Sequence, residues 1–192
     1  MILEHIVEVQ KRTLEKNDDK RITSEYTLAG AYLNSRLRSE CVLGEALLEG
    51  GQVGEALTIL ENVVVIQQRA FKEDDYLRLL SEYALGKAYR KDGRVDDSIQ
   101  LLESVVKVQA EALKPGDNDR LATESELAAA YLDDGRFEDA VEWLEHVVQM
   151  QEGTTHEENG KHRWLQDMLR DAREKLEAGS EKKQQNLGNG EL

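Results

Sequence analysis

The chain has 192 residues, of which 25 are lysine or arginine and 39 are aspartate or glutamate, so its formal net charge is -14. No uninterrupted apolar run reaches the roughly 18 residues of a membrane-spanning helix, and the acid-bearing start MILEHIVEVQ is unlike a secretory signal, so we expect neither a membrane protein nor a secreted one. A single cysteine, Cys41, excludes an internal disulfide framework, and the acidic charge disfavours nucleic acid and anionic lipid; we therefore expect a cytoplasmic protein.

The first predicted element is a helix over residues 2–15. One proline and 5% aromatic residues favour helices over short strands throughout the chain. The pattern of residues 2–15 matches the second helices of the hairpins that follow, but no first helix precedes it. We therefore expect residues 2–15 to be a second helix that lacks the first helix of its hairpin.

The second predicted element covers residues 21–49. In these residues the pattern that is typical of the first helix of a hairpin occurs twice in succession. The string LAGAY at 28–32 is followed 15 positions later by LGEAL at 43–47. A single helix over these residues would be about 43 Å long and would overhang its hairpin. The alternative is a break at Asn34-Ser35, with Ser35 capping a new helix. In either case residues 1–35 hold the N-terminal helix and the start of the duplicated pattern.

From residue 36 onward the sequence repeats every 42 positions. LGKAY at 85–89 returns as LAAAY at 127–131, and LENVV at 60–64 returns as LESVV at 102–106 and LEHVV at 144–148. Each period holds two helical patterns, separated by Gly51, Gly93 or Gly135 where a left-handed helix cap favours glycine. Such hairpins bury their apolar faces only by stacking. We therefore predict an all-α solenoid over 36–178, with units beginning near 36, 78, 120 and 162, and a disordered polar tail over 179–192.

These strings resemble the tetratricopeptide repeat (TPR). Leu85, Gly86, Tyr89, Gly93 and Leu102 match its succession of large and small residues. The 42-residue unit is longer than the usual one of about 34 residues and resembles the kinesin light chain subgroup. The strings are also similar to the repeats of fungal receptor-like STAND ATPases. The resemblance implies a right-handed solenoid of helical hairpins that acts as a protein-interaction scaffold and binds a protein or peptide in its concave groove.

By the same resemblance, certain positions of the first helices face the groove. The candidate site residues are Arg38, Glu45, Leu80, Tyr83, Lys87, Arg90, Lys91, Glu126 and Trp164. The three cations Lys87, Arg90 and Lys91 form a basic island beside Tyr83, which suits a partner peptide that carries an acid and an apolar anchor. The alternative is that these cations only balance nearby acids.

Patterns for other chemistry are missing from the sequence. Neither Gly86-Lys87 nor Gly160-Lys161 follows the glycine that a phosphate-binding loop needs, and the four histidines form no HExxH pair or zinc-site spacing. We therefore expect no enzyme activity, no cofactor and no metal site.

Two further expectations concern charge pairs and assembly. Arg21, Arg36, Arg78 and Arg120 each precede a glutamate by four residues, which predicts intrahelical ion pairs. The long helix and the open ends of the array indicate an alternative function, a structural or oligomerisation module that forms a homodimer.

Overall fold

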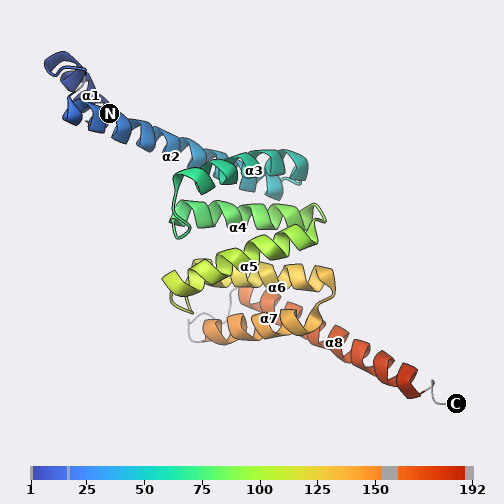
Figure 1. Ribbon diagram of the computed structural model, residues 1–192. Coiled ribbons are helices and arrows are strands. Elements are labelled where there is room, and N and C mark those ends of the chain that lie inside the picture. Colours follow the sequence, from blue (N-terminus) through green and yellow to red (C-terminus); the bar gives the residue numbers. More distant parts are fainter. Residues whose placement is uncertain (1, 17, 153–159, 189–192) are drawn as a thin grey trace.

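The computed structural model describes residues 2–16, 18–152 and 160–188, and these ranges contain eight helices. Figure 1 shows α3 to α7 stacked as successive layers, with α1 and the start of α2 projecting from one end of the stack and the end of α8 from the other. None of the described helices is both long and apolar enough to cross a membrane. The helices are α1 (Ile2–Thr13), α2 (Asp19–Glu49), α3 (Val53–Ala70), α4 (Tyr76–Lys91), α5 (Val95–Ala112), α6 (Asn118–Asp134), α7 (Phe137–Glu152) and α8 (Gly160–Gly188).

Consecutive helices pack against each other along the whole array, from α1 on α2 to α7 on α8. In addition α2 contacts α4, and α4 contacts α6, so the first helices of the hairpins share one face. This is the all-α solenoid of helical hairpins that the repeat predicts. Helices α4, α6 and α8 begin at Tyr76, Asn118 and Gly160, close to the expected unit starts.

Each hairpin turn is built on a glycine in the left-handed region. Gly51, Gly93 and Gly135 have φ angles of 77°, 83° and 77°, a conformation that is strained for residues with a Cβ atom. The next residue then donates its N–H back to the end of the first helix, as Arg94 does to the Tyr89 carbonyl oxygen at 2.9 Å. The predicted glycine caps are confirmed.

An aspartate caps the start of three first helices. Asp18, Asp75 and Asp117 have extended backbone, and their carboxylates accept hydrogen bonds from N–H groups in the first turn of α2, α4 and α6. These N–H groups have no partner within the helix. The acids that the sequence places just before each first helix therefore fix where it begins.

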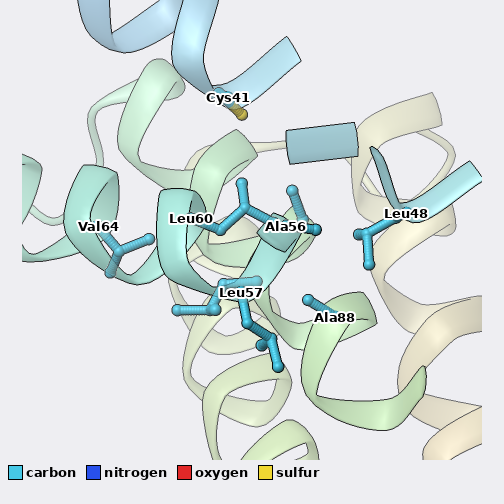
Figure 2. Packing of buried hydrophobic residues seen from close by; sticks show 9 residues of the cluster. Cys41, Leu48, Ala56, Leu57, Leu60, Val64 and Ala88 are labelled. Carbon is cyan, nitrogen blue, oxygen red and sulfur yellow. The ribbon is translucent and has the colours of Figure 1, made fainter. Parts of the chain in front are cut away.

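The core contains leucines that recur once per period. Leu60, Leu102 and Leu144, on α3, α5 and α7, are fully buried. Leu102 lies so close to Gly86 that a Cβ there would be 2.7 Å from it, and Leu60 lies equally close to Gly44. The small residue of the repeat is therefore required by close contact between the two helices of a hairpin. Figure 2 shows the cluster around Leu60.

The second predicted element is one continuous helix. α2 has 31 residues and no break at Asn34-Ser35, so it is about 46 Å long. Its first half pairs with α1, where the Tyr32 hydroxyl bonds to Glu4. Its second half pairs with α3 through the contact of Gly44 with Leu60.

The last helix extends further than predicted. α8 runs to Gly188, whereas the polar composition predicted disorder from residue 179. Residues 179–188 include two lysines, two glutamines and a glutamate, which favour helix. They extend a helix that is already nucleated, so each residue adds a hydrogen bond without the cost of a new nucleus. The part of that prediction that concerns 189–192 lies outside the described residues.

The four predicted arginine–glutamate pairs are all formed. Their N–O distances are 3.1 Å (Arg21–Glu25), 2.8 Å (Arg36–Glu40), 2.9 Å (Arg78–Glu82) and 2.7 Å (Arg120–Glu124). Their surroundings differ, because the Arg36 side chain is 71% exposed whereas the Glu124 side chain is fully buried. Glu124 also contacts Nδ1 of His146 on α7 at 3.0 Å. One sequence pattern thus yields a surface pair at one end of the array and a buried pair near the other.

Candidate functional site

The predicted groove residues lie on the first helices of the hairpins. Arg38 and Glu45 lie on α2, Glu126 on α6, Trp164 on α8, and Leu80, Tyr83, Lys87, Arg90 and Lys91 on α4. Among these residues, an ion pair joins Arg90 of α4 to Glu126 of α6. Arg38 is exposed and Trp164 is 46% exposed, and no hydrogen bond or ion pair among the described residues joins either to the α4 residues.

The basic island is engaged within the chain. The Arg90 guanidinium contacts Glu126 at 2.7 Å and Asp133 at 2.9 Å, both on α6. Lys91 donates to the carbonyl oxygen of Leu48 on α2 at 3.2 Å. Of these cations, Arg90 therefore pairs with two carboxylates, whereas Lys91 bonds to a backbone carbonyl oxygen of a neighbouring helix.

The third cation of the island lies against an aromatic ring. The Lys87 ammonium is 5.5 Å from the centre of the Tyr83 ring, a favourable cation–π distance. Burial, followed by the carboxylates of Glu126 and Glu45, raises the pKa of the Tyr83 hydroxyl above its ordinary value. Arg90 acts in the opposite direction, so Tyr83 is a largely buried ring with groups of both charges nearby.

A pocket opens where α4 and α6 begin. It holds about 100 Å³, several times the space that one water molecule needs. Its lining is mostly apolar and joins the starts of α4 and α6 to the end of α5. The lining residues are Asp74, Tyr76, Leu79, Leu80, Tyr83, Gln109, Ala112, Leu113, Asp119, Ala122 and Thr123.

Sequence reasoning found only part of this pocket. Leu80 and Tyr83 were predicted as groove residues, but Gln109 and Leu113 were missed because they belong to the second helix α5 and its end. A signal for Gln109 exists, since glutamine recurs one period apart at positions 67, 109 and 151.

The other candidate groups have structural partners. Cys41 is buried, and burial raises the pKa of its thiol, so it is a protonated core residue. Within the described part of the chain, no three histidine, cysteine, aspartate or glutamate side chains are placed to hold a metal ion.

Comparisons with known proteins agree on the repeat. Two tetratricopeptide repeat models match the chain, one over residues 79–153 and the other over 37–62. The nearly identical TPR-like repeats of a Podospora anserina protein assigned as a kinesin light chain are 33% identical to this chain, with a TM-score of 0.61, over 97% of this chain and 81% of that one. A point variant of that protein matches with a TM-score of 0.62 and 33% identity over 98% and 81%.

A more distant structure shares the fold alone. BtubC (BKLC) from P. vanneervenii is 15% identical, with a TM-score of 0.59 over 91% of this chain and 72% of that one. No curated protein matches the chain.

Proposed function

Since this chain belongs to the tetratricopeptide repeat family, with repeats like those of kinesin light chains, we propose that it is a non-catalytic scaffold that binds a segment of a partner protein on the face lined by α2, α4 and α6. TPR arrays generally serve as protein-interaction scaffolds, and stacked hairpins offer an extended concave surface for this purpose. A cytoplasmic location and a link to fungal STAND proteins stay predictions.

One observation carries the proposal. A pocket with an apolar lining lies on the face of the first helices, where Leu80 and Tyr83 of α4 meet Ala122 of α6. Concave apolar pockets with a few polar groups are the usual seat of an anchor side chain. We do not include an acid-bearing peptide motif in the proposal, because Arg90, which would bind the acid, already pairs with Glu126 and Asp133.

Photo-crosslinking tests the proposed surface. Benzoylphenylalanine replaces Lys87, which lies 5.5 Å from the ring of the pocket residue Tyr83, and in a second variant it replaces Lys107, an exposed residue of α5. We expect protein adducts from the source cell at position 87 that Leu80→Glu abolishes. The matched control Val65→Glu, at a 46% exposed apolar residue of α3, should leave them unchanged. Adducts that form equally at 107, or that survive Leu80→Glu, contradict the proposal.

A second candidate function, a homodimer formed through α2, is favoured by two exposed apolar residues. Val42 and Leu43 are 56% and 50% exposed, whereas Ala84 and Leu85, one period later, are 0% and 4% exposed. The difference arises because α3 packs against Ala84 and Leu85, whereas α1 pairs with the first half of α2. If a second copy covers these residues, light scattering should give twice the 21.8 kDa chain mass and Leu43→Glu should halve it. A measured mass equal to that of one chain at all micromolar concentrations contradicts the dimer.

A further inference from the structure

The pocket at the start of α4 and α6 has walls that suit an aliphatic chain. Leu79, Leu80 and Leu113 line it together with the rings of Tyr76 and Tyr83. Leu79 is 6% exposed, whereas Tyr76 is 59% exposed, so the lining runs from the core to the surface. A long unbranched side chain gains by burying its methylene groups along such a surface.

A buried hydrogen-bond acceptor also lines the pocket. Gln109 is 4% exposed, and its Oε1 atom has no hydrogen-bond partner among the described residues. An amide oxygen without a partner among the described residues also occurs at Gln10 and at Gln67. At Gln109 it lines a pocket that a ligand can enter. An unpaired buried oxygen favours a ligand that donates a hydrogen bond.

The charges around the pocket select the kind of donor. Asp74 and Asp119 are exposed residues of its lining, and no ion pair among the described residues uses either carboxylate. The exposed ring of Tyr76 adds an aromatic face, which attracts cations. The Gln109 oxygen and the two carboxylates are thus acceptors for a donor that carries positive charge.

We propose that this pocket binds a lysine side chain of the partner segment, with its methylene groups against Leu80 and Leu113 and its ammonium donating to the Gln109 oxygen and the two aspartates. The proposal rests on the proposed function, since it names the anchor that the groove recognises. Arginine, with its longer and planar head, is the closest competitor. An anionic side chain is rejected by the carboxylates.

A set of peptides that differ in one side chain tests the anchor. The probes are fluorescein-labelled acetyl-Gly-Ser-Leu-Xaa-Leu-Ser-Gly amides in which Xaa is lysine, arginine, norleucine or glutamate, titrated with the full chain in low salt. Norleucine keeps the aliphatic stem without the ammonium. We expect lysine to bind at least tenfold tighter than norleucine, and glutamate not to bind. Equal affinities for lysine and norleucine, or no binding by any peptide up to millimolar concentration, overturn the proposal.

Three variants assign the affinity to named atoms. Asp119→Asn should weaken lysine binding several-fold, whereas Asp96→Asn, at the corresponding second residue of α5, should not. Gln109→Met keeps the volume and removes the oxygen, so it should weaken lysine binding and leave norleucine binding unchanged. Leu113→Phe introduces the residue found one period earlier, Phe71, and should fill the pocket and remove the preference for lysine. Equal effects of the Asp96 and Asp119 variants overturn the assignment.

The two experiments can distinguish a failure of the lysine pocket from a failure of the proposed scaffold function. Crosslinked partner at position 87 with no lysine preference among the peptides overturns the lysine pocket and keeps the scaffold. Lysine-selective binding with no groove adduct in cells keeps the pocket and contradicts the scaffold.

Discussion

The Arg90 guanidinium on α4 contacts the Glu126 carboxylate on α6 at 2.7 Å, across the boundary between two hairpins. The side chains are 23% and 10% exposed, so the pair is largely shielded from water. A second contact at 2.9 Å joins Arg90 to Asp133 near the end of α6. Arg90 therefore links successive units of the array. Its charge is already paired with two carboxylates of the same chain, so it is not free to bind a ligand.

Arg90→Ala should lower the free energy of unfolding by about 1–3 kcal/mol, because it leaves Glu126 charged and largely buried without its partner. Arg173→Ala is the matched control. Arg173 contacts Glu145 at the same 2.7 Å, but both side chains are about half exposed, so its loss should cost about 0–1 kcal/mol. Urea denaturation of the two variants measures the difference. Equal losses of unfolding free energy would show that the pair between hairpins contributes no more to stability than the exposed pair.

Gly86→Ala should destabilise the fold by about 1–3 kcal/mol, because the new Cβ would lie 2.7 Å from Leu102. Gly30→Ala is the control in α2, where nothing lies within 4 Å of the added atom. That change should stabilise the chain by about 0.5–1 kcal/mol, since alanine favours helix over glycine. Opposite signs in thermal unfolding are the expected result. Two changes of the same sign would contradict the close contact between α4 and α5.

The sequence predicted the features that depend on neighbours along the chain. The glycines at 51, 93 and 135 and the arginine–glutamate pairs are set within one helical turn, and the period of 42 residues dictates how the hairpins stack. These features could be predicted because each is repeated, so one unit supports the interpretation of the next.

The features that sequence reasoning missed depend on how one hairpin sits on another. Arg90 and Glu126 are 36 positions apart, and Gln109 enters the pocket from a second helix although the groove was expected on first helices alone. Spacing within one helix carries no information on such contacts. The length of α8 was missed for another reason, since polar composition predicts disorder whereas a nucleated helix continues through polar residues.

Cys41 should react slowly with thiol reagents in the folded protein. Burial raises the pKa of its thiol, and nearby Glu45 adds to the rise while a bond with Ser81 opposes it. A raised pKa in the folded state means that the protonated thiol contributes stability below the unfolded pKa of about 8.5 and that this stability is lost as pH rises above it. The urea midpoint should therefore fall between pH 8 and pH 10.

The matched measurement uses Cys41→Ala, whose urea midpoint should fall less over the same pH range. Labelling with a chromogenic disulfide should be slow in buffer and fast in denaturing urea. Rapid labelling of the folded chain would contradict the burial of Cys41.

Ser35→Pro should destabilise the chain by about 3 kcal/mol, because Ser35 lies inside the continuous helix Asp19–Glu49 and proline removes a helix hydrogen bond and clashes with the preceding turn. If the chain broke at Asn34-Ser35 instead, Ser35 would cap a new helix, and Ser35→Ala would then cost about 1 kcal/mol. In the continuous helix Ser35→Ala should be neutral or slightly stabilising, since alanine is the stronger helix former. Circular dichroism with urea denaturation of both variants separates the two arrangements. A mild effect of proline together with a loss on alanine would replace the long helix by two short ones.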